Sequence, residues 1–407
     1  MKKRRNTVLL SRFYVCHFFA GSVNAFLDVL LKNGVIVYAA YKANLDTNQV
    51  GLIATLSWSL FIAPFFIFSA HAGFLGDRYE KRKIALILRT VDCLLVAFAA
   101  LGFLSGNIAL LLVLIFVKGT TSTLFSPLKY ALLSEFLPPS ALATASSVME
   151  AGTMVAMLAG TFVGAVYGAD SNAFKIGMVA LSAIGVSYLM TWAIPKSTAG
   201  NPMLVSPGYN PIKTTLALIR LACLERRCIA AILALSWYWA LGAVYLSNVA
   251  LLVRNVLSGD ENLVANLLLI FTLGVCCGLM LGSLWLQGRA NVKIAKLMAI
   301  VVGIAGLDLY LSIHDALPRT QFDLFCIASA SGVYAVHFSS VLYMTIHPET
   351  KARVFASYNI LSALLVVLSL FFSASLIHYG VNVVLVLAGF ALVTIPVTML
   401  ANRIGHR

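Results

Sequence analysis

Long apolar stretches, each of membrane-spanning length, follow one another along the chain. Short polar segments separate them, and roughly 20 helical residues are enough to cross a bilayer. The first set lies at about 13–41, 48–75, 83–104, 107–135, 140–168 and 173–195, and the second at about 227–257, 263–287, 292–313, 322–346, 353–378 and 381–402. This pattern predicts an all-α polytopic membrane protein with twelve transmembrane helices in two six-helix halves.

The longest polar stretch separates the two sets of apolar segments. It covers residues 196–226 and contains several prolines and basic residues. We therefore predict an N-terminal six-helix half at 1–195, a cytoplasmic linker at 196–226 and a C-terminal six-helix half at 227–407. A weak internal repeat supports two related halves, because Gly282-Ser283-Leu284 and the basic residues after it resemble Gly73-Phe74-Leu75 and its basic tail.

The composition agrees with a membrane protein, and the charges predict its orientation. Hydrophobic residues make up 60% of the chain and charged residues only 11%, whereas soluble domains carry about 25%. Basic residues gather on one side of the predicted spans, and the other side carries only Lys42, Lys175 and Arg319. Because cytoplasmic loops are enriched in lysine and arginine, both termini are predicted to be cytoplasmic. This anchoring explains the net charge of +14, so no nucleic-acid partner is expected.

Sequence motifs for cofactor binding or enzyme chemistry are missing. The seven cysteines are scattered, and neither a phosphate-binding Gly-x4-Gly-Lys-Ser/Thr loop nor a His-Glu-x2-His helix occurs. No pair of nucleophile and base stands out either. We therefore expect no cofactor, no metal site and no enzyme activity.

The run GFLGDRYEKRK at residues 73–83 lies between the second and third apolar stretches. Its first glycine allows two helices to approach closely, and Asp77 suits the N-terminus of a helix or a donor on a facing helix. The basic residues from Arg78 to Arg89 are assigned to the cytoplasmic side. The run resembles the loop between helices two and three of the major facilitator superfamily. That resemblance implies a gating loop that includes Gly73, Asp77, Arg78 and Arg82.

Ionisable residues inside the apolar stretches are the candidates for a substrate site. A charge at the bilayer centre costs about 2.5–3.5 kcal/mol on insertion scales, so such residues usually face a cavity or a partner. Most of them fall in the N-terminal half, and Asp92 and Glu135 are expected nearer its cytoplasmic edge. The candidates for binding substrate are Asp28, Lys32, Lys118, Lys129 and Glu150.

Spacing places several of these candidates on common helix faces. Asp28 and Lys32 are four residues apart, so a structural ion pair and a substrate role for Lys32 both remain open. Lys118 and Lys129 are about three turns apart, and together with Ser122 and Ser126 they form one polar stripe.

Small residues recur at every fourth position of the fifth apolar stretch, at Ala156, Gly160, Gly164 and Gly168. Such a ridge lets the backbone of another helix approach closely. We predict tight helix packing here rather than a substrate contact.

Two regions of the chain resemble bacterial lysophospholipid transporters, a branch of the same superfamily. The first carries SPLKY at 126–130, SEFLPP at 134–139 and MEAGT at 149–153, and is also similar to the transporter part of fused acyltransferase and acyl carrier protein synthetase proteins. The second is NAFLDVLLKN at 24–33. The resemblance implies alternating-access transport of lysophospholipids in the bacterial inner membrane, among membrane lipids and with a separate acyltransferase as partner. It also implies that Lys129 binds the headgroup phosphate, and that Asp28 or Glu150 binds the ammonium.

The same regions depart from that family at identifiable positions. Leu27 and Val29 stand where the family commonly has asparagines, and no arginine occurs between Trp237 and Asn248, where the family often has one. These departures favour an alternative, a major facilitator exporter of a small molecule such as a siderophore or a macrolide. A non-transporting scaffold or receptor is a third hypothesis, which the charges inside the apolar stretches disfavour.

Overall fold

The computed structural model describes residues 11–41, 47–168, 174–198, 211–259, 261–287, 289–313, 317–346 and 350–406. Throughout these residues the regular secondary structure is helical, and twelve helices are long and apolar enough to cross a membrane. The all-α polytopic prediction is therefore confirmed.

The helices follow the predicted apolar stretches closely. In the first part of the chain they are α2 (Arg12–Tyr41), α3 (Thr47–Arg78), α4 (Lys81–Ser105), α5 (Ile108–Phe136), α6 (Pro139–Gly168) and α7 (Phe174–Ala193). In the second part they are α9 (Arg226–Leu252), α10 (Glu261–Leu286), α11 (Val292–Ser312), α12 (Leu317–Thr345), α13 (Lys351–His378) and α14 (Val383–His406), with a π-helical turn η1 (Val253–Leu257) after α9. A further helix, α8 (Pro211–Cys223), lies inside the predicted linker.

Contacts divide the chain into two compact units that do not follow the chain order throughout. The first unit consists of Met1–Leu137, Val155–Ile219 and His347–Ile360, and the second of Pro138–Met154, Arg220–Ile346 and Leu361–Arg407. Helices α6 and α13 thus each contribute one part to either unit. The predicted boundaries of the two halves and the linker, at 1–195, 196–226 and 227–407, describe the order of segments along the chain and stay a prediction.

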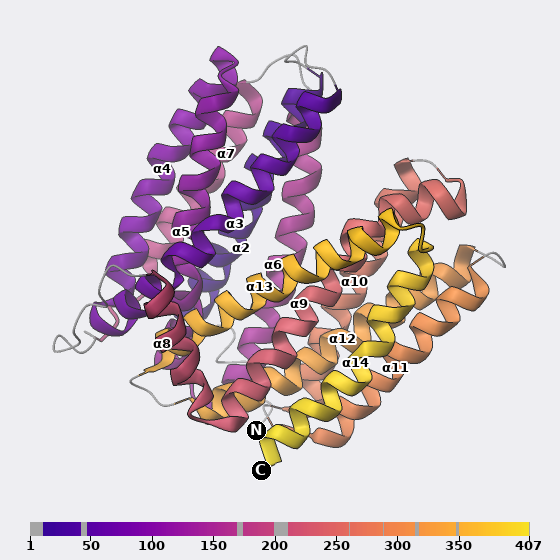
Figure 1. Cartoon of the computed structure of the whole chain (residues 1–407). Helices are drawn as coiled ribbons and strands as arrows, with labels where there is room; N and C mark the ends of the chain where they lie inside the picture. The colour runs from indigo at the N-terminus through magenta and orange to yellow at the C-terminus, as the bar shows by residue number, and fades with distance from the viewer. Residues whose placement is uncertain are drawn as a thin grey trace. The chain divides into compact units, whose positions relative to one another are not determined.

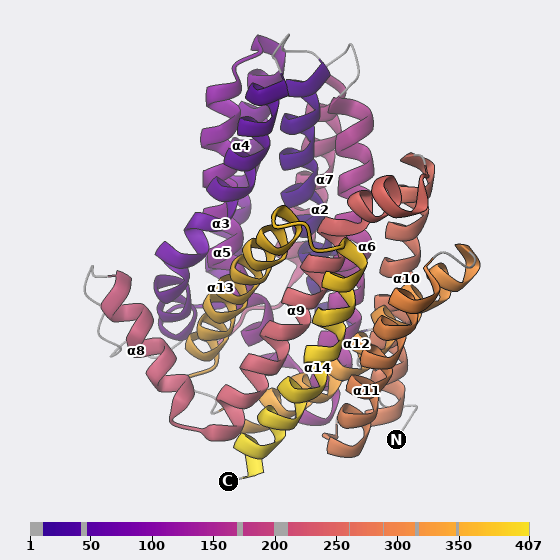
Figure 2. The ribbon, with the colours of Figure 1, turned by 45° about the vertical axis from the view of Figure 1, so that its right-hand side comes forward.

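The first unit is built around α2, α3, α4, α5 and α7, which Figures 1 and 2 show side by side. Its apolar core is formed by buried residues such as Leu27, Leu30, Phe103, Ile115 and Ile176. A polar group that is buried without a partner is unfavourable, so the buried polar side chains of α2, α4 and α5 must bond to one another.

The glycine ridge of α6 packs directly on α2 within this unit. A Cβ atom added to Gly160 would lie 2.5 Å from the main-chain oxygen of Phe26, and one added to Gly164 would lie 2.9 Å from that of Leu30. One added to Gly168 would lie 2.9 Å from the oxygen of Gly34. The predicted tight packing is confirmed, and it fixes the position of α2, which carries Asp28.

The second unit is built around α9, α10, α11, α12 and α14. Helices α10 and α12 approach closely, because a Cβ atom added to Gly278 would collide with the main-chain oxygen of Ser329. Buried hydrogen bonds tie α9 to α14, from Trp237 Nε1 to Thr394 Oγ1 at 2.9 Å and from Tyr245 Oη to the oxygen of Leu387 at 2.9 Å.

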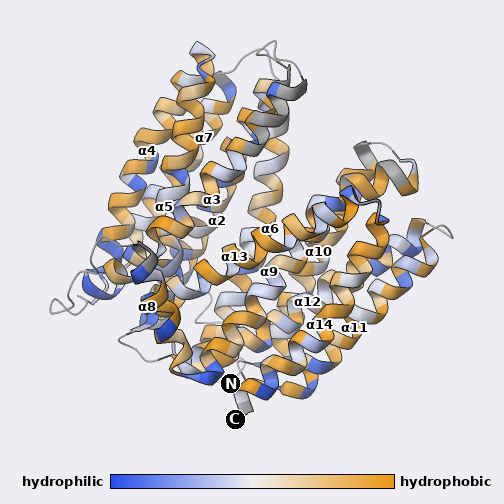
Figure 3. Ribbon diagram, in the orientation of Figure 1, coloured by the Kyte–Doolittle hydropathy of each residue, from blue (hydrophilic) through white to orange (hydrophobic). Residues whose placement is uncertain are grey.

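Many large apolar side chains of the long helices are exposed, and the ribbons of these helices are coloured mostly hydrophobic in Figure 3. Examples are Phe98 and Leu101 on α4, Leu189 on α7, Ile304 on α11 and Phe371 on α13, all exposed. An apolar outer surface of this extent is suited to hydrocarbon rather than to water. The chain is a multi-pass membrane protein.

Candidate functional site

Seven polar side chains from three helices of the first unit meet in its interior. They come from α2, α4 and α5, and all but Asp28 belong to buried residues. We refer to them as the polar cluster, which consists of Asn24, Asp28, Arg89, Asp92, Lys118, Thr121 and Ser122.

The antiparallel packing of α2 against α5 brings Asn24 and Asp28 of α2 next to the polar stripe of α5. His17 Nε2 donates to the main-chain oxygen of Lys129 at 2.8 Å, and Ser122 Oγ donates to Asp28 Oδ1 at 2.7 Å. Gly119 lets α5 approach α3, because a Cβ atom at this position would collide with the main-chain oxygen of Phe61. These helix contacts hold Lys118 in place at the centre of the cluster.

Lys118 is the most connected cation of the polar cluster. Its Nζ atom lies 2.9 Å from Asp28 Oδ1 and 3.4 Å from Asp92 Oδ1. It also donates to Asn24 Oδ1 at 2.9 Å and to Ser122 Oγ at 3.1 Å. A buried ammonium group has three protons to donate, and this arrangement provides acceptors for all of them.

Arg89 and Asp92 form the second ion pair of the cluster. The guanidinium donates to Asp92 Oδ2 at 2.8 Å and to Asn24 Oδ1 at 2.5 Å, and it lies over the ring of Phe125. Thr121 Oγ1 donates to Asp92 Oδ1 at 2.6 Å. Both charged side chains are completely buried.

Arg89 and Asp92 both lie on α4, which begins at Lys81, about two turns before Arg89. The cytoplasmic side for Arg89 and the cytoplasmic edge for Asp92 stay predictions, whereas their place in a buried cluster with Lys118 was not predicted. The three-residue spacing between Arg89 and Asp92, which allows an ion pair on one helix face, is the signal that could have identified them.

Lys32 does not pair with Asp28. Its ammonium lies 4.0 Å from the ring centre of Trp58 and 3.8 Å from that of Phe61, on α3. Within the described residues, Asp28 forms its ion pair with Lys118 instead. The hypothesis of a structural pair between Asp28 and Lys32 is therefore wrong, and Lys32 is a buried cation held by aromatic faces.

The charges of the polar cluster balance, but its members differ in access. Two carboxylates face two cations, so the cluster is formally neutral. The side chain of Asp28 is 16% exposed, whereas that of Lys118 is 1% exposed. Asp28 is thus the charged member that a ligand can reach, with Lys118 behind it.

Lys129 is not part of the polar cluster. It lies eleven residues after Lys118, which is about 16 Å along α5. The neighbouring Ser126 donates to Asn359 Oδ1 at 3.0 Å, so the predicted stripe continues towards the start of α13. The structure therefore brings together Lys118 and Asp28, with Lys32 one turn further along α2, and leaves Lys129 at another level.

Glu150 belongs to the second unit. It lies on the part of α6 that is grouped with Arg220–Ile346, and it is close enough to the buried Tyr238 for an electrostatic interaction. It is therefore not a member of the polar cluster of the first unit.

Asp77 caps the first turn of α13 within the first unit. Its Oδ1 atom accepts from the amide of Ala352 at 3.0 Å, and its Oδ2 atom accepts from Arg353 Nε at 2.8 Å. Gly73 permits this contact, because a Cβ atom there would lie 2.9 Å from the Cα atom of Arg353. A carboxylate at this place compensates the positive end of the helix dipole.

The two arginines of the same loop make different contacts. Arg78 lies over the rings of Phe74 and Tyr79. Arg82 donates to the main-chain oxygen of Trp192 at 2.6 Å, which ties the start of α4 to the end of α7. Only Asp77 of the predicted charged loop residues reaches α13 in these contacts.

Metal chemistry finds no support in the described residues. They contain no group of three histidine, cysteine, aspartate or glutamate side chains placed to hold an ion, and all seven cysteines are free. The polar cluster is arranged for ion pairing and hydrogen bonding.

Twelve apolar helices of membrane-spanning length, together with a buried charged cluster inside the first unit, are typical of a polytopic membrane transporter. Residues 14–370 match the profile of the Major Facilitator Superfamily, and the chain belongs to this family. The fucose:proton symporter of E. coli has the same fold, with a TM-score of 0.74 at 14% identity over 97% of this chain and 98% of that one. Membership of a transporter family points to transport of a small molecule rather than to an enzyme.

Curated relatives are bacterial proteins named lysophospholipid transporter LplT. The protein from Shigella dysenteriae is 25% identical over 302 residues, which cover 70% of this chain and 69% of that protein. The protein from Pectobacterium carotovorum is 29% identical over 142 residues, which cover 35% of this chain and 33% of that protein. The latter alignment therefore spans only about a third of the relative.

Proposed function

We propose that this transporter moves lysophospholipids across the bacterial inner membrane by alternating access. The similarity to LplT proteins over 70% of the chain supports this substrate class. The observation that carries the proposal is the accessible carboxylate of Asp28, which lies within one helical turn of the cation Lys32.

A lysophosphatidylethanolamine headgroup carries an anionic phosphate and an ammonium group a few ångströms apart. Asp28 receives the ammonium, in competition with the ion pair that it forms with Lys118. Lys32 receives the phosphate, since about 6 Å of helix rise separates it from Asp28. Lys129, at another level of α5, acts as a later contact for the phosphate, and Glu150 on α6 is a further candidate contact for the ammonium.

The acyl chain needs no specific polar partner. It stays against apolar helix faces while the charged headgroup crosses, because removal of the chain from hydrocarbon would be unfavourable. The two halves rock to expose the headgroup site to either side in turn. Both termini face the cytoplasm in this proposal, where a separate acyltransferase consumes the imported lysophospholipid.

Uptake of radiolabelled lysophosphatidylethanolamine into spheroplasts without their own lysophospholipid transporter tests this proposal. We expect uptake by the wild type and a loss of about tenfold or more in Asp28→Asn, because a charged hydrogen bond contributes about 1.5–3 kcal/mol. Asp308→Asn is the matched control, since Asp308 pairs with Arg319 at the exposed end of α11. A well-expressed wild type without uptake would contradict the proposal and favour a siderophore or macrolide exporter.

The contact between Asp77 and α13 serves as a latch for one state of the cycle. In Asp77→Asn the ion pair with Arg353 and the favourable charge at the helix end are lost. Because Asp77 contacts no residue of the polar cluster, we expect the maximal uptake rate to fall about tenfold with little change in KM. Glu80→Gln is the control, since Glu80 makes no capping bond to α4. A raised KM at an unchanged maximal rate would argue against a latch.

A further inference from the structure

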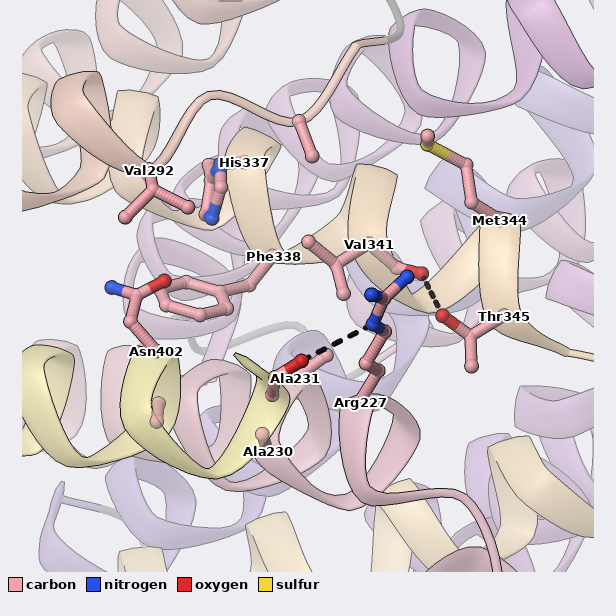
Figure 4. A pocket seen from close by; sticks show the side chains of 13 residues that line it. Arg227, Ala230, Ala231, Val292, His337, Phe338, Val341, Met344, Thr345 and Asn402 are labelled. Carbon is pink, nitrogen blue, oxygen red and sulfur yellow. Dashed lines mark hydrogen bonds between the residues drawn. The ribbon is translucent and has the colours of Figure 1, made fainter. Parts of the chain in front are cut away.

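A cavity of about 230 Å³ lies inside the second unit, apart from the polar cluster. It opens between the beginnings of α9 and α11 and the ends of α12 and α14. Figure 4 shows the side chains around it, with Arg227 from α9 and His337 from α12 on different walls. The charge pattern of the sequence assigns this end of the helices to the cytoplasm.

His337 presents a hydrogen-bond donor to this cavity. Its Nδ1 atom accepts from the main-chain amide of Asn291 at 2.9 Å, so Nδ1 carries no proton. The ring proton of a neutral imidazole must then be on Nε2. The residue is only 1% exposed, and Nε2 has no hydrogen-bond partner among the described residues. A buried donor without an acceptor is unfavourable, and a ligand oxygen would satisfy it.

Arg227 supplies a positive charge at the opening of the cavity. Its Nε atom donates to the main-chain oxygen of Gly405 at 3.1 Å, which fixes the guanidinium against the end of α14. The contacts within the described residues leave the two terminal nitrogens for another acceptor. A planar guanidinium held in this way is suited to a carboxylate.

The remaining walls of the cavity are mostly apolar and include Ala230, Phe338, Val341 and Met344. The two other polar side chains of the lining, Thr345 and Asn402, donate to main-chain oxygens of their own helices. Apolar walls do not favour a chain of water molecules, and the volume is below the about 300–1,000 Å³ of pockets for drug-sized ligands. The occupant therefore has a short apolar body with polar groups at its ends.

We propose that this cavity binds a small amphipathic anion, namely a short carboxylate that also carries a carbonyl oxygen at the far end of its apolar chain. Arg227 binds the carboxylate, and His337 Nε2 donates to the carbonyl oxygen. Binding at this place does not depend on which substrate the polar cluster transports.

The test uses purified full-length protein with ¹³C-labelled histidine rings and three probes. The keto acid 6-oxoheptanoate carries both polar groups, heptanoate lacks the carbonyl, and heptan-2-one lacks the carboxylate. We expect the keto acid to shift the NMR signal of His337 saturably. Each probe that lacks one group should bind about tenfold more weakly, as expected for the loss of one hydrogen-bonded group.

Two variants assign the two polar ends. Arg227→Gln should bind the keto acid about as weakly as the wild type binds heptan-2-one. The adjacent Arg226 is exposed and lies outside the cavity lining, so Arg226→Gln should bind the keto acid like the wild type. In His337→Asn, followed through line broadening of the ligand, keto acid and heptanoate should bind alike. Unchanged signals of the other histidines show that each variant is folded. Equal affinity for all three probes, no shift of His337, or unaltered binding in Arg227→Gln would overturn the proposal.

Discussion

Replacement of Lys118 by methionine is expected to destabilise the protein by about 3–5 kcal/mol and to abolish transport. Lys118 contacts both carboxylates of the polar cluster, at 2.9 and 3.4 Å, and its side chain is 1% exposed. Its removal leaves Asp28 and the completely buried Asp92 with Arg89 as the remaining cation of the polar cluster. The loss of an ionic partner in such surroundings costs more than the pair itself contributes, because the remaining charge stays desolvated.

A double variant separates folding from function in this prediction. Lys118→Met combined with Asp28→Asn removes one charge of each sign, so most of the lost stability should return while transport stays absent. Thermal unfolding in detergent measures the first effect, and lysophospholipid uptake measures the second. Lys293→Met, at the exposed start of α11, is the control. A single variant as stable as the control would show that Lys118 does not compensate Asp28.

Gly160→Leu is expected to produce the second large effect, a loss of the packing between α6 and α2. A Cβ atom at this position would already lie 2.5 Å from the main-chain oxygen of Phe26 and 3.2 Å from the nitrogen of Leu30. The colliding atoms belong to the backbone, so no side chain can move aside. Overpacking against side chains costs about 1–3 kcal/mol, and we expect at least this loss.

The matched control for this substitution is Gly185→Leu on α7. No atom lies within 4 Å of a Cβ atom added to Gly185, so the same change should leave stability nearly unaltered. Protein yield and thermal unfolding in detergent provide the measurement. Equal stability of the two variants would contradict the close approach of α6 and α2.

The transmembrane helices could be predicted from the sequence because hydropathy over about 20 residues is a local property. The glycine ridge of α6 was predictable for the same reason, since its four-residue spacing defines one helix face. The amphipathic helix α8 was missed, because prolines and basic residues in that segment indicated a linker. Its first helical residue is Pro211, a position that proline tolerates.

The partners inside the polar cluster depend on which helices face each other. Spacing alone suggested Lys32 as the partner of Asp28, but the antiparallel packing of α2 and α5 places Lys118 closer. Lys129 belonged to the same predicted stripe, yet the rise of α5 carries it away from Asp28. The cavity beside His337 was not predictable, since it forms where the ends of four helices distant in sequence converge.

The central claim is that this transporter carries lysophospholipids, and reconstitution of the purified wild type into liposomes tests it most directly. Fluorescent lysophosphatidylethanolamine in the outer leaflet can be followed by the fraction that becomes protected from a membrane-impermeant quencher. The account predicts protection that depends on the protein and is blocked by unlabelled lysophospholipid, but not by a siderophore or a macrolide. Liposomes with correctly folded protein and no more protection than empty liposomes would contradict it.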